Sequence, residues 1–438
     1  MRFAIAIPTD ADAWRVVRRA EELGFSRAWF YDTQMLSADP FVAMAAAAVK
    51  TTRIRLGTGV LIPSNRIAPV AANAFASLNK LAPGRIDFGI GTGFTGRRAM
   101  GLGAVKLTEL EEYVRVVMAL LRGETVEAEI ERKKRLIRLL NPELGLINTR
   151  DPIPLYVAAS GPRARRLTAK LGAGWIATSG DVLAMAEMQE WWRASGHQAK
   201  TLDAVVVTGG AVLEEGEPAD SPRSIAQAGP RAAMLLHRAA DAALAGLPMM
   251  APMPPSVAET VAGYVDLARK FTPQGAHYLE NHRGHLMFVK PEEHPFMTAE
   301  LIRLTTFTAT ERELKDRIAA LADTGYAEIA LQIVPGQEHA IEDWGRIRGA
   351  FPWLRRAQGQ LVRIAAGPEP TSSFGPSVSL PSSQRNTSRP QSIIEPTRIV
   401  RPSFEKATPC DQRPIGASVS LRRLSPTTAN RTNVPWSR

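Results

Sequence analysis

Hydrophobic residues in the first 356 positions follow two patterns, short continuous apolar runs and stripes with helical spacing. At three places a helical stripe ends in a glycine, and an apolar run follows directly, as after Gly24, Gly172 and Gly325. A glycine just past a helix is the usual left-handed cap, and an uninterrupted apolar run is typical of a buried parallel strand. The pattern therefore predicts repeated strand and helix units.

Eight such runs occur, with helices between most of them, and this predicts an α/β fold of the TIM (β/α)8 barrel type. An open, doubly wound sheet is the alternative, because strand count alone does not prove closure. The last connection is far longer than a β/α unit needs, so we predict a lid or binding insertion over about residues 209–300. The predicted strands are Arg2–Ile7, Ala28–Tyr31, Ile54–Val60, Ile86–Ile90, Leu155–Ala158, Trp175–Thr178, Ala204–Thr208 and Ile329–Val334.

From residue 357 onward the periodicity stops and Ser, Pro, Thr and Arg dominate. This composition predicts a disordered basic tail over residues 357–438, either regulatory or without a function of its own. Much of the net charge of +11 lies in this tail. Nucleic-acid binding needs a basic face on a folded domain, so we expect no nucleic-acid partner.

The sequence shows no membrane-spanning segment or signal peptide and contains a single cysteine. No apolar run approaches the roughly 20 residues of a membrane-spanning helix, and the apolar run 3–7 is too short for the core of a signal peptide. The single cysteine, Cys410, excludes an intramolecular disulfide framework and a thiolate metal cluster. We therefore expect a cytoplasmic protein with no membrane partner.

A turn after the predicted strand Leu155–Ala158 has the chemistry of an anion site. Ser160 and Gly161 leave backbone N–H groups free, and Pro162 suits the first turn of the helix that follows. The helix dipole adds positive potential at this end. The turn is thus a candidate phosphate cradle, or simply a helix cap.

Two glycine-rich strand ends are further candidates. Gly91, Thr92 and Gly93 begin a G-x-G-x-x-G run, which fits a Rossmann site, a strand end open to a flat ring, or plain tight turns. We favour the open strand end, because the next convincing helix is predicted only near Thr108. Glycines at 57 and 59, inside a predicted strand, indicate either close ligand approach or barrel packing.

Candidate acid–base residues lie in two places. Asp32 follows the strand Ala28–Tyr31 and fits either an active-site carboxylate or a loop-bracing residue. His282 and His285 lie in the long insertion, where metal binding, substrate contact with acid–base work, and an ordinary surface position are the alternatives. No acidic or thiolate partner is apparent at a typical spacing, so we expect no metal site.

Four motifs in order resemble the bacterial luciferase-like superfamily, namely Leu56–Val60, Ser77–Asn79 with Pro83–Arg85, Gly89–Gly93 and Ile153–Pro162. The likeness is greatest to the branch that contains coenzyme F420-dependent methylenetetrahydromethanopterin reductase, and it covers residues 1 to about 352. Residues 1–356 are accordingly expected to form the luciferase-like barrel, and the tail has no counterpart.

The resemblance implies F420, or alternatively FMN, bound at the carboxyl face of the strands. It implies a bulge with a non-prolyl cis peptide behind the cofactor ring, which maps to Gly57, Thr58, Gly59 and Val60. The cofactor phosphate then falls near Ser160 and Gly161. Thr178 and Gly180 are expected to flank the phosphate.

In one respect the sequence departs from the family. Many F420-using members have Asp-His after the second strand, whereas Thr33 follows Asp32 here. Asp32 or a histidine of the insertion, His282 or His285, is therefore the candidate for proton work.

The leading function is an F420-dependent oxidoreductase acting on a small molecule. The alternatives are an FMN-dependent monooxygenase, which would need a flavin reductase partner, and a non-catalytic flavin-binding barrel. A homodimer is a further possibility.

Overall fold

The computed structural model describes residues 1–249 and 253–351. All of them belong to one compact unit, Met1–Glu369. The predicted disordered tail, residues 357–438, lies outside the described residues. Among the described helices, none is long and apolar enough to cross a membrane.

Eight parallel strands close into a barrel in the order β1-β12-β9-β8-β7-β4-β3-β2. The first strand pairs with both β12 and β2, which closes the sheet and confirms the TIM barrel over the open sheet. The eight predicted strands are these eight, within two residues at each end. Their bounds are β1 (Arg2–Ile7), β2 (Arg27–Phe30), β3 (Arg55–Thr58), β4 (Ile86–Ile90), β7 (Leu155–Ala158), β8 (Gly174–Ala177), β9 (Ala204–Thr208) and β12 (Glu328–Gln332).

Helices and short 3-10 turns connect the strands and cover the outside of the barrel. Glycine ends α12 in the left-handed conformation at Gly325, as the sequence pattern predicts. The helices of the barrel are α1 (Trp14–Glu22), α2 (Pro40–Lys50), α3 (Ala68–Leu81), α4 (Phe94–Arg98), α5 (Leu107–Leu121), α6 (Pro162–Lys170), α7 (Val182–Ala194), α12 (Glu311–Thr324) and α13 (Ala340–Gly349), with the 3-10 turns η1 (Pro63–Asn65) and η2 (Pro142–Leu144).

Side chains of β1 show how the barrel is filled. Phe3, Ile5 and Ile7 belong to the large core between strands and helices, whereas Ala4 and Ala6 belong to the core inside the barrel. Large residues outside and small ones inside leave interior space that Trp29 and Tyr156 occupy with an edge-to-face contact. Alternate residues of one strand thus serve two cores.

Buried charges close the amino-terminal end of the barrel. The Arg27 guanidinium lies 2.8 Å from a carboxylate oxygen of Asp87 and 2.9 Å from one of Glu328. Glu328 also accepts a hydrogen bond of 3.1 Å from the indole N–H of Trp29. This network fills the barrel interior at the amino-terminal ends of the strands. A ligand can therefore enter the barrel only from the carboxyl ends.

Residues 123–154 form the smaller of the two insertions. Its strands β5 (Val126–Ile130) and β6 (Lys133–Ile137) pair as an antiparallel hairpin. The basic run that begins at Arg132 therefore lies in a turn and a strand that are exposed to solvent.

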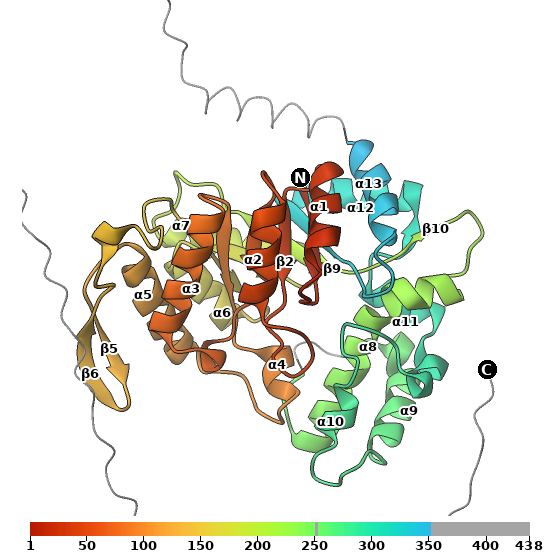
Figure 1. Ribbon diagram of the computed structural model, residues 1–438. Helices are drawn as coiled ribbons and strands as arrows, with labels where there is room; N and C mark the ends of the chain where they lie inside the picture. The colour runs from red at the N-terminus through yellow and green to blue at the C-terminus, as the bar shows by residue number, and fades with distance from the viewer. Residues whose placement is uncertain (250–252, 352–438) are drawn as a thin grey trace, which may run out of the picture. The chain divides into compact units, whose positions relative to one another are not determined.

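The long insertion between β9 and β12 is a helical unit with its own hydrophobic core, which includes Leu236, Tyr264 and Leu301. Figure 1 shows α9, α10 and α11 gathered beside the long helix α8. The elements are β10 (Val212–Leu213), α8 (Pro222–Ala245), η3 (Pro255–Val257), α9 (Ala258–Ala268), α10 (Tyr278–Asn281), η4 (Pro291–Phe296), α11 (Ala299–Thr305) and β11 (Ala309–Thr310), the last pairing with β10.

Candidate active site at the carboxyl ends of the strands

A cavity of about 780 Å³ lies at the carboxyl ends of the barrel strands. Its lining comes from the segments that follow β2, β3, β4, β7 and β8, and from one face of α8. TIM-barrel active sites occupy this face of the fold. Of the residues predicted from the sequence, the cavity is lined by Asp32, Gly59, Gly91, Thr92, Gly93, Ser160, Gly161 and Thr178.

Glycines at the ends of β3 and β4 contribute backbone without side chains to one wall of the cavity. A Cβ atom on Gly91 would lie 2.8 Å from Val60 Cγ2 and 3.3 Å from Ala158 Cβ. On Gly59 a Cβ would lie 2.7 Å from Trp29 Cβ. The Gly59–Val60 peptide is cis, as the family resemblance implies. The neighbouring lining residues Val60 and Ala158 carry small side chains, so this part of the wall suits a flat ring.

Three predicted cofactor residues do not line the cavity. A Cβ on Gly57 would lie 2.7 Å from the Trp29 ring, so this glycine makes room for Trp29 as Gly59 does, but it does not line the cavity. The Thr58 hydroxyl donates to the Gly89 carbonyl at 2.6 Å and ties β3 to β4. At Gly180 a Cβ would lie 2.1 Å from Leu321 Cδ2, where a helix packs close to the backbone. In all three cases the structure gives the residue a packing contact.

The G-x-G-x-x-G run differs from the prediction in one respect. A short helix, α4, begins inside it at Phe94, with Gly93 in the left-handed conformation at φ 81°. We expected no helix before Thr108, because Gly96 and the two arginines after it give a weak helical pattern. The closed barrel still excludes a Rossmann site.

The predicted phosphate cradle lies at the amino-terminal end of α6. Gly161 is the N-cap and Pro162 the first helical residue, as predicted. Space around Gly161 is open, since no protein atom would lie within 4 Å of an added Cβ. Arg163 also lines the cavity and adds positive charge. An anionic group entering here would meet free backbone N–H groups and the positive end of the helix dipole.

Asp32 lines the cavity, and both oxygens of its carboxylate are engaged. Arg66 donates to them at 3.1 and 3.3 Å, and the backbone N–H of Ile62 donates to one of them at 3.0 Å. Asp32 thereby holds the segment that follows the cis peptide. The loop-bracing role is visible in these contacts.

The opposite wall comes from α8 and was not predicted from the sequence. Arg231, Met234 and Arg238 lie on one face of this helix and line the cavity, as does Arg98 of α4. Arg231 donates to the carbonyls of Thr178 and Val207 at 3.0 and 2.8 Å. The spacing i, i+3, i+7 could have indicated this face, but a single sequence does not show which face of a helix meets a ligand.

Charge on this wall is incompletely neutralised. Arg98 pairs with Asp241 at 2.8 Å, whereas Arg238 has no carboxylate partner among the described residues, and its Nε has no hydrogen-bond partner there. The Arg238 guanidinium lies 4.6 Å from the Phe94 ring. Burial, followed by the charges of Arg231 and Arg98, lowers the pKa of Arg238 to about 10. An anion would satisfy this buried cation.

Both histidines predicted as catalytic lie behind the α8 wall. His282 and His285 are each 2% exposed, and neither lines the cavity. His285 reaches it only through the hydroxyl of Thr95, which lies 3.4 Å from Nε2. The ordinary surface position that the sequence left open is therefore wrong for both residues.

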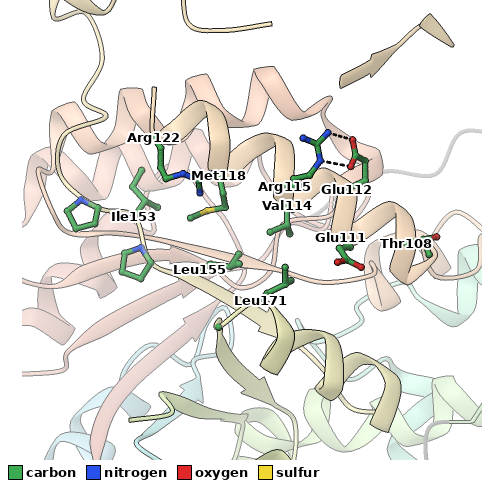
Figure 2. A pocket seen from close by; sticks show the side chains of 13 residues that line it. Thr108, Glu111, Glu112, Val114, Arg115, Met118, Arg122, Ile153, Leu155 and Leu171 are labelled. Atoms are coloured by element: carbon green, nitrogen blue, oxygen red, sulfur yellow. Dashed lines mark hydrogen bonds and ion pairs between the residues drawn. The ribbon is translucent and has the colours of Figure 1, made fainter. Parts of the chain in front are cut away.

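A second cavity, of about 670 Å³, lies on the outside of the barrel between α5 and the segment before β7. Figure 2 shows its lining, with Glu112 paired to Arg115 above Ile153 and Leu155. Leu155 is the first residue of β7, so this cavity lies toward the amino-terminal end of that strand. TIM-barrel enzymes do not place their chemistry there.

Fold and cavity together define a (β/α)8 barrel with a cofactor-sized site at its carboxyl face. A family model for luciferase-like monooxygenases matches residues 6–328. The chain therefore belongs to the luciferase-like monooxygenase family.

Similar proteins include F420-dependent glucose-6-phosphate dehydrogenases. The one from Beutenbergia cavernae is 39% identical over 145 residues, which cover 31% of this chain and 41% of that protein. The one from Kineococcus radiotolerans is 32% identical over 207 residues, covering 43% and 60%. The chain thus spans about two fifths to three fifths of the length of these relatives.

Two solved structures share the fold. The coenzyme F420-dependent tetrahydromethanopterin reductase from Methanopyrus kandleri has a TM-score of 0.57 at 19% identity and covers 78% of this chain and 97% of its own. An F420-dependent secondary alcohol dehydrogenase has a TM-score of 0.54 at 16% identity, covering 79% and 98%. At these identities the likeness concerns the fold alone.

Proposed function

We propose that this protein is an F420-dependent oxidoreductase that transfers hydride between the deazaflavin and a small organic substrate with an anionic group. The observation that carries the proposal is the contrast between the two walls of the cavity. A backbone wall of glycines lies at the ends of β3 and β4, and a cationic wall of arginines lies on α8.

The residues present fit the cofactor. Gly59 and Gly91 line the strand-end wall without side chains of their own, beside the small side chains of Val60 and Ala158. Ser160 and Gly161 offer backbone donors at the start of α6 for a phosphate, and Thr178 lies on the lining beside them. When bound, the deazaflavin supplies hydride transfer at its C5 atom, while the protein supplies binding and orientation.

The α8 wall fits the substrate. Arg238 is half-buried and has no carboxylate partner among the residues that the structure describes, so an anionic substrate gains a charge-assisted hydrogen bond there. Arg231 is held by two backbone carbonyls and is therefore fixed in position. The relatives named for glucose-6-phosphate act on a phosphorylated compound, which supports an anionic group without identifying the substrate.

For the proton that accompanies hydride transfer, we propose Asp32. It is the one carboxylate on the cavity lining among residues 1–249 and 253–351. His285 is the second candidate, acting through the Thr95 hydroxyl. His282 is linked to the cavity through Asp241 and Arg98, and a guanidinium does not relay a proton. The Asp32→Asn variant keeps the shape, so a lower kcat with unchanged cofactor affinity would support the first assignment.

Titration of the full-length protein with F420 and with FMN tests the proposal. We expect one equivalent of F420 to bind at least about tenfold more tightly than FMN, a difference of about 1.4 kcal/mol. Anaerobic bleaching of bound F420 by anionic alcohols or aldehydes would then identify substrates. A protein that retains FMN and ignores F420 would contradict the proposal.

The second candidate is an FMN-dependent monooxygenase, which the family model favours by its description. It would consume oxygen with reduced flavin from a reductase partner. Binding of either cofactor without any turnover, and no effect of Asp32→Asn, would instead support a non-catalytic barrel.

We further propose that the protein is cytoplasmic and forms a homodimer. Its binding partner in the reaction is a small-molecule substrate. Size-exclusion chromatography with light scattering tests the dimer, and cell fractionation tests the location.

A further inference from the structure

Three buried histidines meet behind the α8 wall, outside the cavity already described. His237 comes from α8, and His282 and His285 come from the end of α10 and the turn after it. The ring centroids lie 4.9 Å apart for His237 and His285, 5.1 Å for His282 and His285, and 5.9 Å for His237 and His282. One nitrogen from each ring lies within 4.8 Å of the other two.

The outer nitrogen of each ring has a fixed partner. Nε2 of His237 lies 2.6 Å from a Glu293 carboxylate oxygen, and Nε2 of His282 lies 3.1 Å from one of Asp241. Nε2 of His285 lies 3.4 Å from the Thr95 hydroxyl. Metal-binding histidines are commonly oriented by such outer carboxylates and hydroxyls, which leave the other nitrogen free to ligate.

The inner nitrogens are incompletely satisfied. Nδ1 of His237 and Nδ1 of His285 lie 2.6 Å apart and share one hydrogen bond. Nδ1 of His282 has no partner among the described residues, although this side chain is 2% exposed. A buried polar atom without a partner is unfavourable and needs a reason.

From this arrangement we propose a binding site for a divalent transition-metal ion of the Zn²⁺ or Co²⁺ type, ligated by Nδ1 of His237, His282 and His285. Imidazole nitrogens suit such ions, whereas Mg²⁺ and Ca²⁺ require oxygen ligands. Three nitrogens occupy three positions of a tetrahedral zinc site, and a water molecule completes it.

Binding requires a small adjustment and no net loss of protons. Two ligands of one tetrahedral zinc ion at ordinary Zn–N lengths lie about 3.4 Å apart, so the His237 and His285 rings separate by less than about 1 Å. The proton on Nδ1 of His285 moves to its Nε2, which then donates to Thr95. Each ring thus presents Nδ1 to the ion and keeps its Nε2 contact with Glu293, Asp241 or Thr95.

An alternative use of the cluster as a proton relay is less favourable. The chain from Thr95 through His285 and His237 would deliver a proton to Glu293. Glu293 is fully buried and is already engaged by His237, by the Tyr264 hydroxyl and by Lys290, so these contacts offer the proton no exit to solvent. A relay also leaves Nδ1 of His282 without a partner, whereas a metal ion ligated by all three rings accounts for that atom.

The metal would fasten the turn that carries His285 to α8. The next residue, Leu286, lines the substrate cavity together with Met234 and Arg238 of α8. The sequence suggested no metal because the third histidine lies far from the His282-x-x-His285 pair along the chain. The packing of α10 against α8 within the insertion brings them together.

Metal loading of tag-free, full-length protein tests the site. After chelation, exposure to Zn²⁺ and desalting, we expect about one equivalent of zinc per chain and a higher Tm. Cobalt in place of zinc should give the visible absorption bands of a low-coordinate nitrogen site. Both signals should fall at least tenfold in His282→Gln and stay unchanged in His294→Gln, which removes an exposed histidine of the same insertion.

Wild-type protein that retains less than a tenth of an equivalent would overturn the proposal, whatever the variants do. Equal retention by His282→Gln, folded as judged by circular dichroism, would overturn it too. If His282→Gln does not fold, His285→Gln is measured in the same way. These readouts do not involve F420, so they stand apart from the outcome for the proposed oxidoreductase.

Discussion

The strand-end wall and the α8 wall of the cavity are built on different principles. The first is backbone, with Gly59 and Gly91 positioned where any side chain would collide. The second is made of long cationic side chains, among them Arg231 and Arg238, on a helix of the insertion. A wall of backbone can support a cofactor of constant shape, whereas a wall of side chains can differ between relatives with different substrates.

The largest effect is expected from adding charge to the phosphate cradle. Ser160→Asp places a carboxylate beside the amino-terminal end of α6, where the cofactor phosphate is proposed to lie. We expect F420 affinity to fall about 100-fold or more, equivalent to about 2.7 kcal/mol. The Tm should stay the same, because an acidic residue near a helix start is favourable for the helix itself.

The matched control for this variant is Ser160→Asn, which has the same shape without the charge. It should keep F420 affinity within a few fold. An equal loss of F420 affinity in both variants would mean that the shape of residue 160, and not its charge, determines binding.

The second prediction distinguishes the role of the α8 wall from that of the strand-end wall. Arg238→Met removes the unpaired cation of the α8 wall and keeps an apolar chain of similar length. We expect KM for an anionic substrate to rise about 10- to 100-fold, as for the loss of one charge-assisted hydrogen bond. The Kd for F420 should not change.

Arg269→Gln serves as the control for Arg238, since Arg269 is an exposed arginine of the same insertion. It should leave both constants unchanged. A loss of F420 affinity in Arg238→Met would contradict the division of roles between the walls.

A smaller effect concerns the charged network that closes the other end of the barrel. Asp203 is bonded to Arg2 at 2.5 Å and to the Tyr156 hydroxyl at 2.7 Å. Burial alone would raise the pKa of Asp203, but the charges of Arg2 and Arg27 lower it below the usual value. A carboxylate with a lowered folded-state pKa stabilises the fold above its unfolded pKa, and this stability is lost as the pH falls below it.

Asp203→Asn should therefore lower the free energy of unfolding by about 1 kcal/mol at pH 7. The difference between variant and wild type should shrink as the pH falls below about 4, the ordinary range for Asp. Urea unfolding at several pH values measures this. A difference independent of pH would show that the charge of Asp203 does not contribute.

The smallest effect is expected from removing the tail. A protein ending at residue 356 keeps all the described residues that line the cavity, so we expect its F420 affinity and Tm to match those of the full chain. A fall in Tm of several degrees would show that the tail docks on the barrel.

The sequence predicted the barrel well because strand periodicity and glycine caps are local signals. The same holds for the Ser160 and Gly161 turn, whose position at a strand end is visible in the sequence. Gly57 and Gly180 are predicted as site residues because a single sequence does not distinguish a glycine on a cavity lining from one covered by packed side chains.

The α8 wall was missed for a different reason. The roles of these α8 residues depend on contacts with segments far away in the chain. Arg231 contacts Thr178, and His237 contacts Glu293. Helical periodicity shows that these residues belong to a helix, but not what its faces meet. Long-range contacts of this kind are set by tertiary packing.

A crystal structure of the full-length protein with F420 bound tests the central claim most directly. We predict that the deazaflavin ring lies against Gly59, Val60 and Gly91, that its phosphate lies at Ser160 and Gly161, and that Arg238 faces the space left for the substrate. A ring bound against the arginines of α8, with the glycine wall empty, would contradict the account.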